Sequence, residues 1–175
     1  MKTMEQSIVL EEEEDTLKGK YLTFSLGNEI YGIEICYVTE IIGIQSITEI
    51  PELPAYMKGI INLRGMIIPV MDVRLRFKKP YQEYNNRTCI IVIKENDSSI
   101  GLIVDRVAEV LKIGENDIVN PPSIMNAAQK FIKGMGKTGN EVKLILDCNM
   151  LINTGDLEEL SIQEQPVTSN QEGTR

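Results

Sequence analysis

Two aspartates in the sequence have the type and spacing of a carboxylate pair for acid–base catalysis. Asp72 and Asp147 each close an apolar strand, and they correspond to one another in two similar halves of the chain. Aspartic proteases use two carboxylates that share a proton on matching turns. Those turns usually read Asp-Thr-Gly or Asp-Ser-Gly, whereas the turns here read Asp-Val-Arg and Asp-Cys-Asn. We therefore expect both aspartates to cap turns at strand ends rather than to form a catalytic dyad.

The remaining residue types exclude most other catalytic chemistry. The chain contains no histidine, so histidine bases, histidine metal ligands and serine–histidine or cysteine–histidine catalysis are excluded. The three cysteines, Cys36, Cys89 and Cys148, lie far apart, form no CxxC motif, and are expected to be reduced and buried. These observations predict a protein that is not an enzyme and that holds no metal and no cofactor.

Two segments resemble ligand-binding loops only in composition. Residues 134–139 are rich in glycine and lysine, but they lack the preceding strand and following helix of a phosphate-binding loop. The sequence predicts a hairpin turn there. The acidic residues 11–15 are predicted to form a solvated tail rather than a site for a divalent ion.

Isolated charges in apolar strands point to binding instead. Arg64 and Asn62 interrupt an apolar stretch and lie two positions apart, so they share one face of a strand. Glu40 is similarly isolated, and arginine is favoured at protein interfaces because its rigid fork offers five donors. A solvated polar face is the competing interpretation for all three residues. The basic run that ends the next strand is predicted to face solvent; it consists of Arg74, Arg76, Lys78 and Lys79.

The acidity of the chain is concentrated at its two ends. Residues 1–18 hold six acids and two bases, residues 156–175 hold five acids and one base, and residues 19–155 hold 15 of each. A balanced body argues against nucleic-acid binding, and tails this poor in apolar residues are expected to be flexible. There is no apolar run long enough to cross a membrane and no apolar core of a secretion signal. We expect a cytoplasmic protein with no direct membrane insertion.

The elements that must position these residues are mostly strands. Apolar periodicity predicts strands at residues 21–26, 30–35, 41–50, 59–65, 66–72, 88–94, 100–104, 108–113 and within 141–152. Apolar residues at helical spacing predict one helix over residues 123–133, with single helical turns near Val38 and at residues 55–58. The polar residues 78–86 are the predicted boundary between two halves.

The two halves are similar to one another. Residues 30–42 align with residues 99–111, and residues 57–72 align with residues 132–147, with glycine, glutamate and aspartate at matching positions. A repeat of about 70 residues with some five strands closes most naturally into a small barrel, because closure removes exposed edges. The fold is therefore predicted to be all-β with a few short helices. The two modules are predicted to span residues 19–86 and 87–155.

The segment from residue 58 to residue 74 carries a specific motif. It reads KGIINLRGMIIPVMDVR, and with this pattern of K-G-x-x-N-L-R-G-x-x-x-P-x-x-D-V-R it resembles the CheW family of bacterial chemotaxis coupling proteins. Residues 21–40, the segment IGLIVDRV at residues 100–107, and the later segments FIKGMG and LILD extend the resemblance over residues 19–155. The resemblance implies two SH3-like five-stranded barrels around a shared hydrophobic core, and a non-enzymatic adaptor.

The resemblance also implies partners and contact residues. Proteins of this family bridge the cytoplasmic tip of methyl-accepting chemoreceptors to the regulatory domain of the histidine kinase CheA, and take no small-molecule substrate. By the family's pattern, the residues that would face the receptor are Arg64, Asn62, Glu40 and Gly101. The residues that would lie at the kinase contact are Val38, Gly43 and Gly59. A requirement of backbone geometry is the alternative interpretation for the three glycines.

Other interpretations remain open within the same fold. The chain could be a CheW-like coupling module of another two-component pathway, the front half of the hybrid coupling protein CheV, or a regulatory domain of a CheA kinase. CheV also carries a receiver domain, for which the roughly 20 polar residues after residue 155 are expected to be too few. No kinase motif is found upstream, which makes the third interpretation the weaker one.

Overall fold

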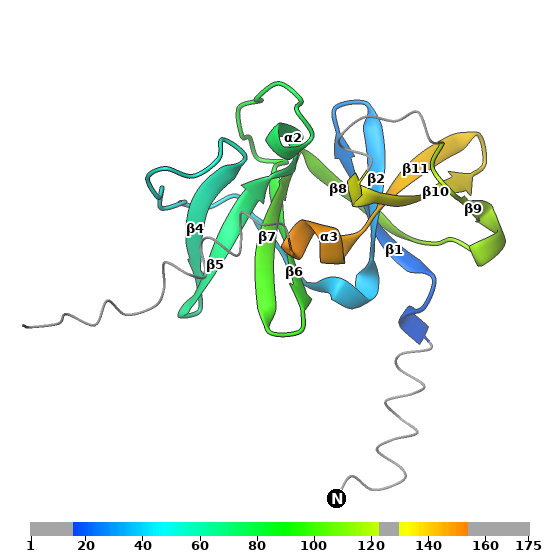
Figure 1. The fold of residues 1–175 in the computed structure, drawn as a ribbon, viewed down its shortest axis with the longest axis horizontal. Helices are drawn as coiled ribbons and strands as arrows, with labels where there is room; N and C mark the ends of the chain where they lie inside the picture. The colour runs from blue at the N-terminus through cyan, green and yellow to red at the C-terminus, as the bar shows by residue number, and fades with distance from the viewer. Residues whose placement is uncertain (1–15, 123–129, 154–175) are drawn as a thin grey trace, which may run out of the picture.

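The protein consists of two curved β-sheets that lie side by side (Figure 1). We describe a computed structural model, in which residues 16–122 and 130–153 are placed. The six-stranded sheet, called barrel A below, has the order β8 (Arg106–Lys112), β1 (Lys20–Leu26), β2 (Glu29–Glu34), β11 (Glu141–Leu146), β10 (Ile132–Thr138) and β9 (Ile118–Val119). The five-stranded sheet, barrel B, has the order β3 (Val38–Gly43), β6 (Cys89–Glu95), β7 (Ser98–Val104), β5 (Met66–Asp72) and β4 (Met57–Leu63).

The helices are short and lie at the ends of strands. The α-helices are α2 (Val73–Arg76) and α3 (Cys148–Ile152), and the 3-10 turns are η1 (Ile35–Tyr37) and η2 (Glu115–Asp117). No described helix has the length and apolar character needed to span a membrane. The prediction of an all-β fold with a few short helices is confirmed.

The two halves of the sequence exchange their first hairpins. The β1–β2 hairpin joins β8–β11 of the second half, and the β6–β7 hairpin joins β3–β5 of the first half. The chain therefore crosses between barrels at η1 and again at Asp105. The predicted division into residues 19–86 and 87–155 is wrong for this reason. Periodicity identifies which residues form strands, but it carries no information on which strands pair across the parallel contacts β5–β7 and β11–β2.

The internal repeat is present in the structure down to single positions. Val70 pairs with Gly101 in barrel B, and their repeat counterparts Ile145 and Gly32 pair in barrel A. The equivalent strands β4 and β10 each carry a bulge at the same position, between Met57 and Gly59 and between Ile132 and Gly134. The two barrels are therefore copies of one plan, each assembled from both halves of the chain.

A shared hydrophobic core joins the barrels, and each barrel also has its own interior. The shared core takes side chains from both sheets, and a row of rings crosses it from Phe24 through Tyr31 and Phe77 to Phe131, with centroids 5.5–5.8 Å apart. Barrel B has an interior cluster around Ile90 and barrel A a smaller one of Tyr21, Ile113 and Ile145. Separating the halves would expose this shared core, so the exchange and the core stabilise one another.

Several local predictions were wrong. The strand expected at residues 41–50 is β3, which begins at Val38 and ends at Gly43, and the helical turn before it is the 3-10 turn η1. Residues 55 and 56 form a turn, and residues 57 and 58 are the first two residues of β4. Most of the helix predicted at residues 123–133 lies outside the described residues, and its last two positions begin β10. The glycines of residues 134–139 lie in β10 and its turn, so the hairpin prediction is correct there.

Candidate protein-docking site

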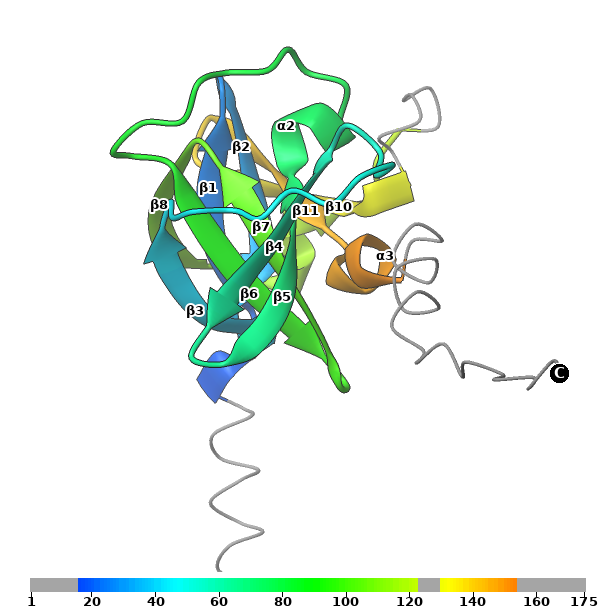
Figure 2. The same ribbon diagram turned by 90° about the vertical axis from the view of Figure 1, so that its left-hand side faces the viewer.

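Arg64 stands at the tip of the β4–β5 hairpin, on the barrel that faces the viewer in Figure 2. Arg64 and Gly65 form a two-residue turn and have φ angles of 50° and 84°. Two successive positive φ values are typical of the turn whose twist matches that of a β-hairpin. The side-chain oxygen of Asn62 accepts a hydrogen bond from the backbone N–H of Gly65 at 2.8 Å. Asn62 therefore positions Arg64 by fixing the turn that carries it.

Arg64 reaches across the barrel to Glu40. Its two terminal nitrogens donate to the two carboxylate oxygens of Glu40, with 3.2 Å between Nη1 and Oε1. Glu40 lies on β3 and Arg64 follows β4, and these two strands are the opposite edges of the sheet. The bidentate ion pair therefore spans the opening of barrel B. It also brings together two of the three charged or polar residues that the sequence singled out.

The ion pair leaves most of the guanidinium accessible. The side chain of Arg64 is 74% exposed, whereas that of Glu40 is 25% exposed. The hydrogen bonds and charge of Glu40 raise the pKa of Arg64 above its usual value, so the guanidinium is always charged. The pair holds a charged planar fork in a fixed direction at the molecular surface, which is the property that a docking contact needs.

Exposed apolar side chains are also found on the strands that carry the ion pair. Ile41 on β3 and Met66 and Ile67 on β5 are 43%, 58% and 54% exposed. Sequence reasoning missed them because it treated apolar residues as core. The alternation within β3 is a signal that could have found Ile41, since it lies on the face opposite to Val38 and Ile42. Exposed large apolar residues beside a fixed charge favour protein binding over catalysis.

Gly101 does not belong to this surface, and its prediction as a receptor-facing residue is contradicted. It is buried in β7, and a Cβ atom there would lie 2.8 Å from methyl groups of both Ile90 and Val70. Its repeat counterpart Gly32 is also buried, and a Cβ atom there would lie 3.1 Å from the Cδ1 methyl group of Ile145. Close packing therefore favours glycine at both positions, more strongly at Gly101 than at Gly32.

The three residues assigned to the kinase contact differ in accessibility. Gly43 is exposed at the end of β3, and a Cβ atom there would meet open space. Val38 is half-buried and packs against the shared core. Gly59 is buried with a φ of +139°, and a Cβ atom would lie 2.0 Å from the carbonyl oxygen of Thr48. Backbone geometry explains Gly59, whereas Gly43 is free to make an external contact.

The aspartates expected to cap turns do so. Asp72 accepts a hydrogen bond from the N–H of Leu75 at the start of α2, and Asp147 accepts one from Met150 at the start of α3, both at 3.2 Å. Asp72 also accepts from the hydroxyl of Tyr84 at 2.7 Å. Burial and this hydrogen bond raise the pKa of Tyr84 above its usual value. Each carboxylate is held by its own helix, which is not the arrangement of a proton-sharing dyad.

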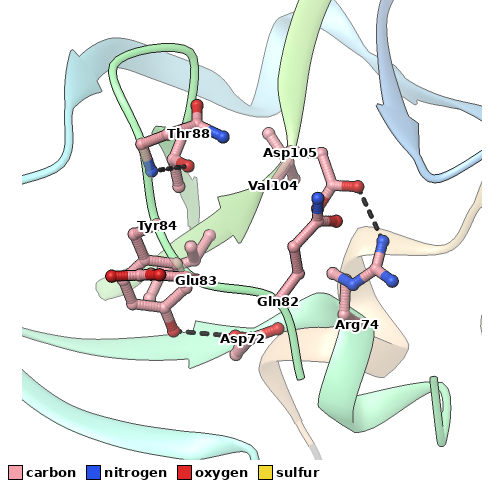
Figure 3. Close-up of a pocket in the computed structure, with 10 residues that line it drawn as sticks. Asp72, Arg74, Gln82, Glu83, Tyr84, Thr88, Val104 and Asp105 are labelled. Atoms are coloured by element: carbon pink, nitrogen blue, oxygen red, sulfur yellow. Dashed lines mark hydrogen bonds and ion pairs between the residues drawn. The ribbon is translucent and has the colours of Figure 1, made fainter. Parts of the chain in front are cut away.

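A small pocket beside Asp72 is filled with paired polar groups (Figure 3). Arg74 Nη1 and Asp105 Oδ2 form an ion pair at 2.7 Å, and their side chains are 14% and 23% exposed. Asp105 also accepts from the backbone N–H of Gly27 at 2.7 Å, and Arg74 Nε donates to the carbonyl oxygen of Pro80. These contacts join the crossover residue of the chain to barrel A and to the linker before β6. Their chemistry is structural.

The basic run does not face solvent as predicted. Arg74 forms the ion pair with Asp105, Lys79 pairs with Glu29 of β2 at 2.9 Å, and Arg76 is stacked between aromatic rings. Lys78 alone among the four is exposed. The other three lie at the contact between barrels, because α2 and the residues that follow it contact both β2 and Phe131, which precedes β10.

The cysteines are unpaired as predicted, but only one of the three is buried. All three are free thiols; Cys148 is buried, Cys89 is intermediate and Cys36 is exposed. Burial raises the pKa of Cys148 to about 12, which makes its thiol a poor nucleophile. The described residues contain no cluster of three or more metal-ligating side chains.

Comparison with known proteins gives a consistent result along the whole body of the chain. The family model described as a CheW-like domain matches residues 20–156. The chain is 32% identical to the chemotaxis protein CheW of Klebsiella aerogenes over 157 residues, covering 89% of this chain and 93% of that protein. It is 33% identical to CheW of Treponema pallidum, covering 80% of this chain and 85% of that protein.

A solved structure is similar in both sequence and fold. The crystal structure of the scaffolding protein TtCheW from Thermoanaerobacter tengcongensis matches with a TM-score of 0.73 and 38% sequence identity. The match covers 79% of this chain and 90% of that chain.

Proposed function

The chain belongs to the CheW-like domain family, and from this premise we propose that it is a chemotaxis scaffold that couples methyl-accepting chemoreceptors to the histidine kinase CheA. It works in the cytoplasm, at receptor arrays that it joins through its partners, and it transfers no chemical group. The Arg64–Glu40 ion pair across the opening of barrel B is the observation that carries the proposal. It is an oriented, exposed charge on a rigid support, suited to reading a partner's surface.

Receptor contact is assigned to the β4–β5 turn. Arg64 presents the guanidinium, Glu40 orients it and Asn62 fixes the turn. A receptor tip is a helical hairpin, and a helix that carries a carboxylate or a backbone carbonyl terminus can compete for the exposed side of the guanidinium. Met66, which is exposed and directly follows the turn, then offers apolar area to the same helix.

Kinase contact is assigned to β3, which begins at Val38 and ends at Gly43. β3 is an edge strand of its sheet, and the open space at Gly43 lets another protein approach the backbone closely. Gly59 contributes indirectly, because it lets Thr48 pair with Ile60 and so shapes the segment that follows β3.

Titration calorimetry of the full chain against a receptor cytoplasmic hairpin and, separately, a CheA regulatory domain tests the receptor assignment. We expect Arg64→Ala to weaken receptor binding by about tenfold or more while kinase binding is retained, as is typical of an interface arginine. Arg87→Ala removes another exposed arginine from the same barrel region and serves as the matched control.

The outcomes separate the parts of the proposal. If both partners bind and Arg64→Ala changes neither affinity, the scaffold function stands and the receptor surface lies elsewhere. If the folded protein binds neither partner, coupling of these two proteins is wrong, and a coupling module of another two-component pathway becomes the better assignment.

A second variant tests the kinase assignment. Gly43→Glu places a charge at an exposed position where an added Cβ atom has no neighbour within 4 Å, so the fold should be retained. We expect the variant to lose kinase binding and to keep receptor binding. Gly114→Glu, at an exposed position in barrel A, is the control. Equal effects of the two variants on the kinase would contradict the assignment.

A further inference from the structure

Arg76 is the one residue of the basic run that is partly buried and has no counter-charge in the described part of the chain. Arg74 and Lys79 of the same run are paired with Asp105 and Glu29, and Lys78 is exposed to solvent. Arg76 appears in no ion pair or hydrogen bond among residues 16–122 and 130–153, and its Nε is buried without a partner. Burial lowers the pKa of Arg76 from its usual value, with no described acid to oppose the change.

The guanidinium of Arg76 is held between two aromatic rings. Its central carbon lies 4.4 Å from the ring centre of Tyr56 and 4.5 Å from that of Phe131. Tyr56 and Phe131 are repeat counterparts, since their carbonyl oxygens accept from Asp72 and from Asp147 respectively, both at 2.7 Å. Arg76 therefore contacts equivalent positions of the two halves, and its guanidinium packs over two aromatic rings.

A guanidinium fixed in this way is arranged to bind a carboxylate. Contact with two rings restricts the motion of the side chain, so binding of both oxygens of one carboxylate by the terminal N–H groups would cost little further side-chain freedom. The Nζ atom of Lys130 lies 4.9 Å from the ring centre of Phe131 and adds a second positive charge beside Arg76. The counterpart of Arg76 in the repeat is Leu151, which is fully buried, so the charge is not required by the fold plan.

We propose that Arg76 and Lys130 form a carboxylate-binding site, and that its occupant is the acidic C-terminal segment of the same chain, through Asp156, Glu158 or Glu159. Residues 156–175 hold five acids and one base, which complements the two cations. α3 fixes where this segment begins, because Leu151 and Ile152 pack in the same core cluster as Phe131. The three acids follow Asn153 by three to six residues, a reach of about 10–20 Å. Ion pairing at this site would hold the acidic segment against the contact between the two barrels.

Nitrogen-15 NMR of the arginine Nε–Hε groups in the full chain tests the site. The Arg76 signal is identified as the one lost in Arg76→Lys. We expect it to move when Asp156→Asn, Glu158→Gln and Glu159→Gln are combined, because the carboxylate leaves the fork. Glu172→Gln neutralises a distal acid of the same segment and should leave the signal in place. Superimposable Arg76 signals in the wild type and the triple variant would overturn the proposal.

A thermodynamic cycle gives a second readout. Arg76→Leu, which copies the repeat counterpart, is combined with the triple variant, and unfolding equilibria are measured in urea. We expect the tail substitutions to lower the folding constant by roughly twofold to fivefold in the wild type, and to leave it unchanged beside Arg76→Leu. Arg76→Lys replaces Arg76→Leu in the cycle if the latter does not fold. An Arg76 signal that moves with protein concentration would assign the carboxylate to a second copy and refute the intramolecular site.

Discussion

Barrels A and B share one strand plan but place their charges differently. In barrel B, Arg64 and Glu40 lie on opposite edges of the sheet and join across its opening. The corresponding positions in barrel A are Gly139 and Glu109, which cannot form this pair. Barrel A instead pairs Lys143 with Glu141, two residues apart within one strand. Among residues 16–122 and 130–153, only barrel B therefore has an exposed ion pair that links the two edge strands of its sheet.

The two crossovers between barrels also differ in the burial and pairing of their polar residues. At one, Asp105 is held by Arg74 and by the backbone of Gly27, in a setting that is largely buried. The repeat counterpart of Asp105 is Cys36, which is exposed, and the nearby ion pair of Lys133 with Glu34 is partly exposed. The two crossovers therefore occupy matching places in the repeat and differ at a few polar positions.

The largest difference between the barrels is expected at the bulge glycines. Gly59→Ala brings a Cβ atom within 2.0 Å of a backbone oxygen at a positive φ, whereas Gly134→Ala meets a side-chain methyl group of Ile118 at 2.7 Å. We expect Gly59→Ala to lower the free energy of unfolding by about 3 kcal/mol or more, and Gly134→Ala by about 1 kcal/mol. Urea unfolding followed by circular dichroism measures both. Equal losses would mean that the bulges are equivalent in strain.

The next largest difference is expected at the crossovers. Arg74→Ala leaves Asp105 partly buried without its cation, so we expect a loss of about 3 kcal/mol, against at most about 1 kcal/mol for Lys133→Ala. Combining each variant with its partner substitution in a double-mutant cycle isolates the pair energies. A larger coupling for Lys133 with Glu34 would reverse the comparison.

The helix caps should show a smaller difference. Asp72 is buried and serves both α2 and the hydroxyl of Tyr84, whereas Asp147 is half-buried and caps α3. We expect Asp72→Ala to cost about 2–3 kcal/mol in the free energy of unfolding, and Asp147→Ala about 1 kcal/mol. Tyr84→Phe separates the two roles of Asp72, since it should remove only the hydroxyl contribution. A cost for Asp147→Ala as large as that for Asp72→Ala would contradict the difference.

Acid should reveal the smallest difference. The hydroxyl of Tyr31, followed by Lys79, lowers the pKa of Glu29, and Lys143 lowers that of Glu141. A carboxyl whose pKa is lower in the folded state stabilises the fold above its unfolded pKa of about 4.3, and this stabilisation is lost as the pH falls through the folded pKa. Glu29→Gln should therefore be less stable than wild type near neutral pH, by less than about 1 kcal/mol, with the difference vanishing in acid.

Glu141→Gln is the comparison for this measurement. Glu29 pairs with a lysine outside barrel A, whereas Glu141 pairs within its own strand and its side chain is 66% exposed. We expect the smaller change in pH dependence from Glu141→Gln, measured by urea unfolding at a series of pH values. A larger change in pH dependence from Glu141→Gln than from Glu29→Gln would show that the contact between barrels is not the more pH-sensitive of the two.

The accuracy of the sequence predictions follows the range of the interactions involved. Alternation in residues 21–26 and the apolar run from residue 88 specify strands through local backbone geometry, and both were correct. The helix predicted over residues 123–133 overlapped the start of β10. Over so short a window, Ile132 fits both the helical and the strand periodicity. Arg64 was predicted at the end of a strand but lies in the turn that follows β4, and its partner Glu40, 24 positions away, was selected only as a separate polar residue.

By itself, the sequence determined the all-β class, the internal repeat, the family and the capping aspartates. These depend on local periodicity, on turn chemistry and on matching positions, all of which are written along the chain. The tertiary structure decided which hairpin joins which barrel, that Gly101 is buried, that Arg64 meets Glu40 and that Arg76 lies between Tyr56 and Phe131. Those outcomes depend on pairing between distant segments, because burial of a shared apolar core favours the exchange and no local pattern encodes it.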